Sequence, residues 1–345
     1  SCKGCKRECE NNVDMALIKV EYLAQVAQQK GYSLRSRLFA HTPHWLYHKS
    51  WLKSLIRYRN QNVFMASLGD IFLKLSPKIA LPVPTDKPFK GKDSPTLMDQ
   101  KQDVVLFSDT FSRYFEPNTL RCAQELLKAA GYRVIHAHPQ DQEERPLCCG
   151  RTFLAQGMVE KAKAEAQRLC DSLEQHINAG RLVIGLEASC VLGLRDDAKA
   201  LGLGDRLEKI SNNTFLLEEF LSKEIRAGRF NLAFKSRAGQ KTLIHGHCHQ
   251  KAVGAMKAVR RVLKEIPDHD FEIIESGCCG MAGTFGLESE HHDLSHELAE
   301  QSLMPTLRTH PEASVIANGF SCRQQIKSHK DDRPQHLAVF LRNAL

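Results

Sequence analysis

The chain contains 345 residues, enough for two domains at roughly 150 residues each. Hydrophobic residues make up 42% and charged residues 26%, an ordinary globular balance that excludes a disordered or fibrous protein. No apolar run approaches the ~18 residues that a membrane-spanning helix needs, and the start shows no signal-peptide pattern. Because residue 1 is Ser rather than Met, we expect a fragment or a processed product. Because a secretory signal is lacking, we expect the protein in the cytoplasm.

The net charge of +8 is concentrated near the N-terminus. Residues 1–92 hold 16 Lys and Arg against 6 Asp and Glu, whereas the rest of the chain has a net charge of −2. This distribution indicates docking to something acidic, such as a partner domain or an anionic lipid surface, rather than nucleic acid. A solvated helical face explains the same charge equally well.

The first 75 residues are predicted to be helical, with Asn12 as a cap and Gly31 as the end of the first long helix. Residues 37–59 form a basic, amphipathic stretch that contains both tryptophans. This pattern suits the inner face of a membrane, and it suits packing against the rest of the chain slightly better. Residues 76–101 contain five prolines and are interpreted as a linker between domains.

From residue 102 onward the same pattern occurs twice, which predicts a duplicated βαβ domain of the α/β class with parallel sheets. The repeats are expected over residues 102–235 and 236–345. Matched Cys-Cys-Gly and Ser-Cys motifs lie 41 residues apart in the first repeat and 43 in the second. The expected strands are 103–108, 133–137, 181–186, 242–246, 271–275 and 314–318, and the expected helices are 117–130, 152–178, 250–264 and 287–303.

Twelve cysteines are many for a chain of this size, and they fall in clusters rather than as scattered pairs. Clustered cysteines without a secretory signal are typical of metal or redox chemistry. In the second repeat they lie in loops that follow strands, where parallel sheets bind ligands. One edge of this sheet would therefore gather four thiolates, those of Cys248, Cys278, Cys279 and Cys322.

Four thiolates fit a cubane [4Fe–4S] cluster or a structural zinc ion. The adjacent pair Cys278 and Cys279 favours the cluster, because neighbouring thiolates can each bind a different iron but fit poorly around one small ion. Unligated buried cysteines and a disulfide between the adjacent pair remain as alternatives.

The first repeat has a poorer site, made of Cys148, Cys149 and Cys190. Thr110 stands where the second repeat has Cys248, and Asp109 precedes it. We expect this degenerate site to serve the interface between the repeats or to have lost its metal. Cys122 and Cys170 lie in helical patterns and are interpreted as core residues.

Cys2, Cys5 and Cys9 resemble the end of a bacterial ferredoxin cluster motif. The first cysteine of that motif would lie two residues before Ser1, and Glu10 replaces the usual proline. This truncated motif is not expected to hold a complete cluster by itself, and we expect it to be disordered or free of metal.

Together these motifs resemble the cysteine-rich (CCG) domain of the heterodisulfide reductase B subunit and of the iron–sulfur subunits of glycolate oxidase and anaerobic glycerol-3-phosphate dehydrogenase. The nearest resemblance is to the C-terminal part of FAD-linked oxidase/iron–sulfur fusion proteins, similar to D-lactate and D-2-hydroxyglutarate dehydrogenases. The motifs that carry it are residues 1–5, 13–16, 109–111, 148–151, 247–252, 277–283 and 319–323.

The resemblance implies an electron-transfer role beside a flavin domain of the same full-length polypeptide, with a quinone-like acceptor. The chain has no Gly-x-Gly-x-x-Gly and is not expected to oxidise a 2-hydroxy acid by itself, because FAD would belong to the missing domain. His247, His249 and Arg323 would surround the main cluster, with Asp109 beside the degenerate site.

One departure concerns the cluster type. Each heterodisulfide reductase site ends in Cys-x-x-Cys, whereas Gly193 and Gln325 stand at the matching places here. A four-cysteine site is therefore the better interpretation. Two other functions stay open: a docking module stabilised by zinc, and a thiol reductase that uses Cys278 and Cys279 directly.

Overall fold

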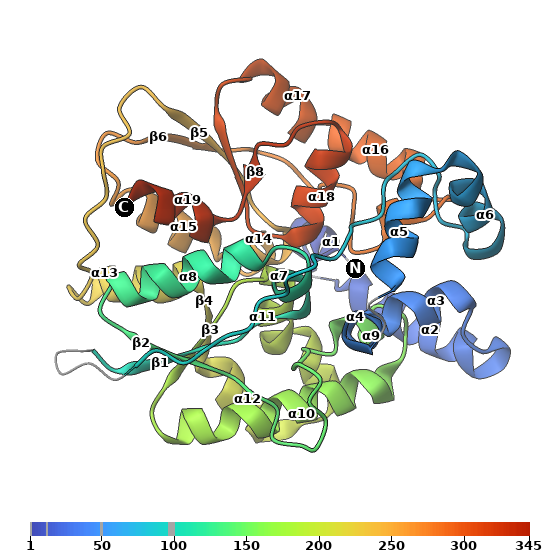
Figure 1. Cartoon of the computed structure of the whole chain (residues 1–345), viewed down its shortest axis with the longest axis horizontal. Coiled ribbons are helices and arrows are strands. Elements are labelled where there is room, and N and C mark those ends of the chain that lie inside the picture. Colours follow the sequence, from blue (N-terminus) through green and yellow to red (C-terminus); the bar gives the residue numbers. More distant parts are fainter. Residues whose placement is uncertain (1, 12, 49–50, 96–100) are drawn as a thin grey trace.

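The computed structural model describes residues 2–11, 13–48, 51–95 and 101–345, and it contains two four-stranded parallel sheets (Figure 1). The strand orders β2-β1-β3-β4 and β6-β5-β7-β8 are the same order in two copies, which confirms the duplicated α/β fold. The strands are β1 (Asp103–Leu106), β2 (Arg133–His136), β3 (Leu182–Gly185), β4 (Thr214–Leu216), β5 (Lys241–His245), β6 (Asp270–Ile273), β7 (Ser314–Ala317) and β8 (Pro334–Gln335).

Helices cover both sheets. In the first repeat they are α7 (Thr110–Tyr114), α8 (Pro117–Ala129), α9 (Arg151–Leu154), α10 (Val159–Asn178), α11 (Ala188–Arg195), the 3-10 helix η1 (Asp197–Leu201), α12 (Gly204–Asn212) and α13 (Leu217–Arg226). In the second they are α14 (Cys248–Ala252), α15 (Met256–Leu263), η2 (Phe285–Leu287), α16 (His292–Glu300), α17 (Leu303–Thr309), α18 (Phe320–Ser328) and α19 (Leu337–Ala344).

Three long helices expected from the sequence are shorter or divided in the structure. The predicted helix 152–178 is interrupted before Val159, where Gly157 has a φ of 73° and lies against the backbone of Leu23 and Ala24. The predicted helix 250–264 is interrupted at Gly254, whose φ is 71°. Glycine readily adopts this left-handed conformation, which ends a helix. The predicted helix 287–303 begins later, at His292, and ends at Glu300.

The two repeats share one hydrophobic cluster at their interface, in addition to a core within each repeat. Helices α8 and α13 of the first repeat pack against α19 and α15 of the second. The shared cluster includes Leu126, Ile184, Ile244, Val259 and Phe340. Because these side chains are removed from water only when both repeats are present, burial of the cluster stabilises the pair as one body.

Six N-terminal helices form a layer on the repeats: α1 (Gly4–Glu8), α2 (Met15–Lys30), α3 (Leu34–Ala40), α4 (Thr42–His48), α5 (Leu52–Gln61) and α6 (Val63–Leu73). Asn12 lies outside the described residues, and the side chain of Asp14 caps α2. In α3, Ala40 joins the core of the first repeat while Phe39 packs on that of the second. The predicted packing of this region is therefore found, although Trp51 stays 60% exposed.

The proline-rich segment forms no helix or regular strand over its described residues 76–95. It is held along the surface by backbone hydrogen bonds, including those from Phe89 N to Arg113 O and from Ser94 N to Val134 O. The buried guanidinium of Arg59 donates to the carbonyl oxygens of Ser76 and Ile79. Residues 96–100 of the expected linker lie outside the described part of the chain.

Several basic residues of the N-terminal region pair with acids of the two repeats. Lys6 contacts Asp196 of the first repeat at 2.7 Å, and Arg35 makes two hydrogen bonds to Glu290 of the second. The acidic surface that the charge pattern indicated is therefore partly supplied by this chain. Among the described residues, no helix is both long enough and apolar enough to cross a membrane.

Equivalent glycines in the two repeats explain part of the Cys-Cys-Gly motif. Gly150 and Gly280 have φ values of 80° and 92°, which side chains rarely adopt. A Cβ atom on Gly150 would lie 2.5 Å from the carbonyl oxygen of Ala162, and one on Gly280 would overlap that of Ser295. Each glycine therefore lets a cysteine loop approach the backbone of the following long helix.

Replacing Gly280 with Ala should destabilise the protein more than replacing Gly239, which has a φ of 74° but open space around it. We expect G239A to lower the free energy of unfolding by about 1 kcal/mol, from backbone strain. G280A adds a backbone clash and should cost at least ~2 kcal/mol more. Guanidinium unfolding curves test this difference, and equal midpoints for the two variants would contradict it.

A buried carboxyl group joins the repeats and makes stability depend on pH. Glu218 of α13 accepts hydrogen bonds from the amides of Gln250 and Asn318 in the second repeat. Burial raises the pKa of Glu218 to about 7, from an ordinary value of 4.5. The folded state therefore binds more protons than the unfolded state between these values, so stability should fall as pH rises through this window.

We expect this group to remove roughly 3 kcal/mol of stability between about pH 4.5 and 7.5. Glu218→Gln keeps the size of the side chain but does not titrate. The free energy of unfolding of the variant minus that of the wild type should therefore increase over the same range. Urea unfolding at several pH values measures it, and a difference that does not change with pH would rule out this role.

Candidate metal centre

The cysteines of the second repeat lie where its strands end. Cys248 is the first residue of α14 after β5, and Cys278 and Cys279 follow β6. Cys322 lies in the first turn of α18, after β7. Because β5, β6 and β7 are parallel neighbours, their carboxyl ends deliver the three loops to one edge of the sheet.

The thiols at this edge form a continuous series of contacts. Cys279 contacts both Cys278 and Cys322, and Cys278 also contacts Cys2 from the N-terminal segment. Cys2 in turn contacts Cys248. The structure thus brings together all four cysteines expected at the main site, and it adds Cys2 as a fifth.

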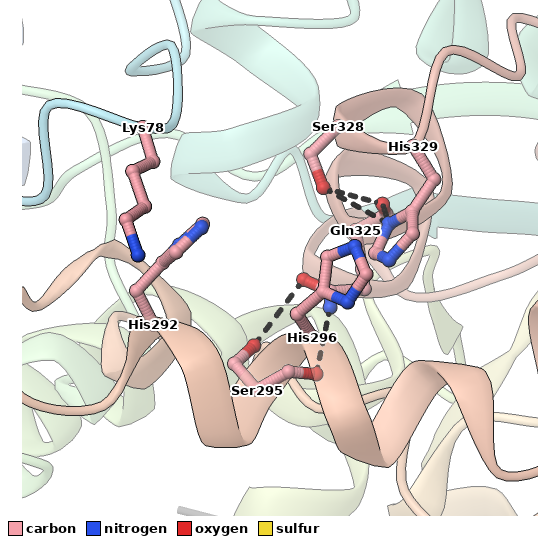
Figure 2. A pocket seen from close by; sticks show the side chains of 7 residues that line it. All are labelled: Lys78, His292, Ser295, His296, Gln325, Ser328 and His329. Atoms are coloured by element: carbon pink, nitrogen blue, oxygen red, sulfur yellow. Dashed lines mark hydrogen bonds between the residues drawn. The ribbon is translucent and has the colours of Figure 1, made fainter.

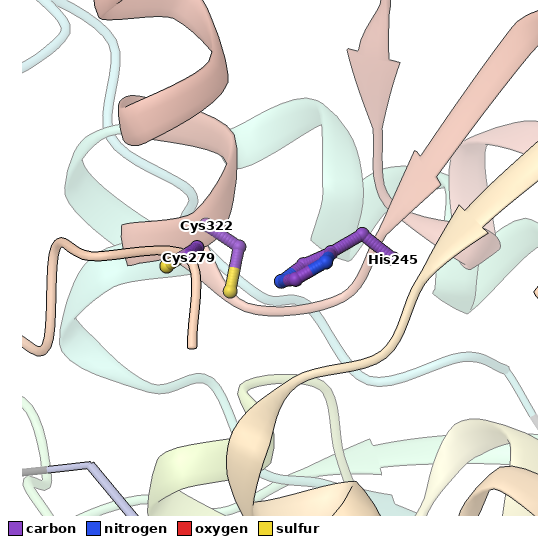
Figure 3. A group of neighbouring side chains, drawn as sticks. All are labelled: His245, Cys279 and Cys322. Atoms are coloured by element: carbon purple, nitrogen blue, oxygen red, sulfur yellow. The ribbon is translucent and has the colours of Figure 1, made fainter. Parts of the chain in front are cut away.

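His245 also lies at this centre, although sequence analysis missed it. Its side chain is buried at the end of β5, and its ring points toward Cys279 and Cys322 (Figure 3). One ring nitrogen lies within 4.8 Å of both sulfur atoms. Burial and nearby Lys251 lower the pKa of His245 to about 3, so the ring is neutral at physiological pH. The available signal was its place near the end of an expected strand, three residues before Cys248.

Burial and mutual contact favour the protonated forms of Cys248 and Cys279 in the absence of a cation. The hydrogen bond with Cys2 and burial raise the pKa of Cys248 to about 11. Contact with Cys322 and burial hold the pKa of Cys279 well above its usual value, although its bond with Cys278 lowers it. Several thiolates at this spacing would repel one another, so the donor set fits a positively charged metal centre that removes the protons.

The flanking polar residues have distinct contacts. His249 Nδ1 lies 3.6 Å from the sulfur of Cys248, as expected for a histidine beside the site. His247 is buried and caps α14 by accepting a hydrogen bond from His249 N. Arg323 is buried, pairs with Glu116 of the first repeat and donates to Ala317 O. These contacts orient the loops, and they place the charge of Arg323 against a carboxylate.

The corresponding site of the first repeat has three adjacent thiols. Cys149 lies 3.0 Å from Cys190 and also contacts Cys148. Thr110 begins α7 as Cys248 begins α14, so the first repeat has a hydroxyl where the second has a thiol. Asp109 is buried and caps α7, and burial with nearby Glu187 raises its pKa to about 6. Oδ1 of this carboxyl caps the helix, whereas Oδ2 is buried without a hydrogen-bond partner among the described residues, and the carboxyl acts electrostatically on Cys190.

The two cysteine centres lie close together across the repeat interface. Helix α11, which carries Cys190, contacts α14, which carries Cys248. Arg151 interacts electrostatically with both Cys149 and Cys248, and it pairs with Asp197. His249 Nε2 lies 3.7 Å from the same carboxylate. Asp197 thus contacts side chains of both repeats, Arg151 of the first and His249 of the second.

The N-terminal segment is held against this region by a buried lysine. The side chain of Lys3 is only 1% exposed, and its Nζ lies 2.5 Å from Asp197, 3.2 Å from Asp196 and also against Asp14. Helix α1 contacts α14 as a result. The segment was expected to be disordered or free of metal. The structure describes residues 2–11, in which Cys2 joins the main centre, Cys5 is exposed and Cys9 is partly buried, and the expectation of a metal-free motif stays a prediction.

Removing the charge of Lys3 should release this segment. Lys3→Met removes the buried cation that Asp14, Asp196 and Asp197 share. Because Arg151 still pairs with Asp197 and Lys6 still lies 3.5 Å from Asp14, we expect a cost below the about 3–5 kcal/mol that is typical when a buried charge is left alone. Amide hydrogen exchange of residues 2–11 should become markedly faster. Lys6→Met is the matched control, because the Lys6 side chain is 28% exposed and its loss should change exchange much less. Unchanged protection in K3M would contradict the role of Lys3 as a clamp.

Comparison with known proteins connects this geometry to named relatives. The C subunit of anaerobic glycerol-3-phosphate dehydrogenase from Escherichia coli is 26% identical over 71% of this chain and 60% of its own length. D-2-hydroxyglutarate dehydrogenase of E. coli is 21% identical over 95% of this chain but only 32% of its own length. Lactate utilization protein A of Bacillus subtilis is 22% identical over 69% of this chain and 98% of its length.

The chain therefore spans 60% and 32%, respectively, of the two E. coli relatives. Residues 109–195 and 242–327 each match the family described as the cysteine-rich domain, CCG. The first segment contains β2, β3 and the three thiols of the first repeat, and the second contains most of β5, all of β6 and β7, and the four thiols of the main centre. Because the matches together cover half of the sequence, the chain belongs to the cysteine-rich CCG domain family.

Proposed function

We propose that this chain is the iron–sulfur electron-transfer portion of a flavin-dependent 2-hydroxyacid dehydrogenase. Cys248, Cys278, Cys279 and Cys322 would hold a [4Fe–4S] cluster, which supplies one-electron redox chemistry when bound. The observation that carries the proposal is the unbroken series of thiol contacts at the strand ends of the second repeat.

One feature supports iron–sulfur over zinc. Cys278 and Cys279 are adjacent in sequence and in contact, an arrangement better suited to several metal atoms than to one tetrahedral ion. A zinc-bound docking module is therefore the weaker alternative.

The protein around the thiols would hold the site and limit access of water. Cys279 and Cys322 are almost fully buried, while Cys248 and Cys278 are partly exposed on the side where Cys2 lies. The guanidinium of Arg151 and the imidazole of His249 lie near Cys248, so they would offset negative charge from thiolate ligands. Residues 2–11 would cover the exposed side.

The first repeat would hold no complete cluster of its own. Its three thiols have Thr110 in the fourth position, and the nearby carboxyl of Asp109 caps a helix. We propose that this degenerate site supports the interface, since Cys149 and Cys248 share Arg151 as an electrostatic neighbour.

The named relatives support a flavin-containing partner. Two are named as a dehydrogenase or as part of one, and one of these is about three times as long as the region matched here. We propose that a flavin domain of the same full-length polypeptide supplies electrons and that a quinone-like acceptor receives them. The exposed aromatic and apolar side chains of α5 and α6 would be available for a partner or for the inner membrane surface.

The proposal predicts that iron and acid-labile sulfide are lost together in Cys279→Ala. Protein purified without oxygen should be brown and contain about four irons and four sulfides per chain. C279A removes a thiol at the centre of the series and should lose most of both. Cys170→Ala, a buried cysteine of the first-repeat core, is the control and should keep them.

Two further variants distinguish the main centre from the thiols of the first repeat and of the N-terminal segment. Cys149→Ala should leave the iron content unchanged, and Cys2→Ala should lower it less than C279A does. A colourless wild type that contains one zinc per chain, or equal iron in C279A and C170A, would overturn the proposal.

A further inference from the structure

A second group of potential metal ligands lies on the outer helices of the second repeat, on residues outside the thiol centre. His296 and Glu300 are four residues apart on α16, so both side chains project from the same face of the helix. His329 follows the last residue of α18. One ligand atom from each of the three residues lies within 4.8 Å of the others.

His329 is positioned as a preorganised ligand. Its side chain is only 5% exposed, and its Nδ1 lies 2.9 Å from the carbonyl oxygen of Gln325. A carbonyl only accepts hydrogen bonds, so Nδ1 carries the proton and Nε2 carries the lone pair. Nε2 is buried and has no hydrogen-bond partner among the described residues. A buried nitrogen of this kind is costly unless something binds it.

The other two residues face this nitrogen. The ring of His296 stacks on that of His329 with centroids 4.4 Å apart, and Figure 2 shows the two rings side by side. Oε1 of Glu300 lies 3.7 Å from His329 Nε2. Arg308 pairs with this carboxylate and keeps its pKa below the usual value, so it is ionised at neutral pH.

We propose that His296, Glu300 and His329 form a binding site for a divalent transition metal ion of the zinc type. Two imidazoles and one carboxylate are a common ligand set for such ions, and they leave positions open for water. A pocket of about 180 Å³ adjoins His296 and His329 and gives space for those waters. The site needs no thiol and is independent of the cluster proposed above.

Binding there would connect two helices that support the thiol centre. Helix α18 carries Cys322, and α16 presents the Ser295 carbonyl that Gly280 approaches. Gln325 already joins the helices by donating to Ser295 O at 3.0 Å. A metal ion would add a second connection and should raise the thermal stability of this repeat.

Zinc itself is the probe, applied to the cluster-loaded protein so that the four thiols of the main centre are already occupied. Crystals soaked in zinc chloride should show an anomalous peak, present above but not below the zinc absorption edge, between His296, Glu300 and His329. In solution, His296→Ala and His329→Gln should each weaken binding of this zinc roughly tenfold or more. H296A removes an exposed side chain, so it tests the site even if H329Q folds poorly.

His292→Ala is the matched control. His292 lies on the same helix and lines the same pocket, but it stands beside Lys78 and outside the ligand group (Figure 2). H292A should bind zinc as the wild type does and show the same zinc-dependent rise in melting temperature. Zinc found only at cysteines, or equal affinities for H296A and H292A, would overturn the site without affecting the iron–sulfur proposal.

Discussion

The crowding of thiols at one sheet edge is the constraint on which the rest of the structure depends. Parallel strands deliver Cys248, Cys278, Cys279 and Cys322 to one place, and the N-terminal segment brings Cys2 to the same place. Such thiols ionise together only if a cation neutralises them. The glycine turns, the capped short helices and the buried lysine all serve to hold this arrangement.

The duplication explains how one body carries two unequal centres. Both repeats keep the same strand order and the same Cys-Cys-Gly turn, but they share a hydrophobic cluster at their interface and meet through charged contacts such as Arg323 with Glu116. Because the repeats are packed together, the first repeat does not become a separate domain although Thr110 stands where a fourth thiol would complete its site. Its neighbours instead support the second repeat, for example where Glu187 accepts a hydrogen bond from Phe320 N.

Sequence patterns predicted the parts of the fold that strong local signals encode. The buried apolar runs indicated six of the eight strands, and the repeated cysteine motifs indicated the duplication. β4 and β8 were missed because they are three and two residues long, too short for a periodic pattern. The interruptions at Gly157 and Gly254 were missed because a single glycine within a helical pattern is often tolerated.

The candidate site, like the fold, was predicted from the sequence only in part. Spacing identified the cysteines of each centre, since strand ends converge in any parallel sheet. His245 and the contact of Cys2 were not predicted, because both depend on how distant segments pack. Cys2 is placed by the ion pairs of Lys3 with Asp196 and Asp197, which are far away in sequence, and no local pattern reveals such a partner.

The most direct test is anomalous scattering at the iron absorption edge from crystals grown and kept without oxygen. Iron density is expected within bonding distance of the sulfur atoms of Cys248, Cys278, Cys279 and Cys322. Density from zinc at this place, or no metal there after anaerobic reconstitution with iron and sulfide, would contradict it.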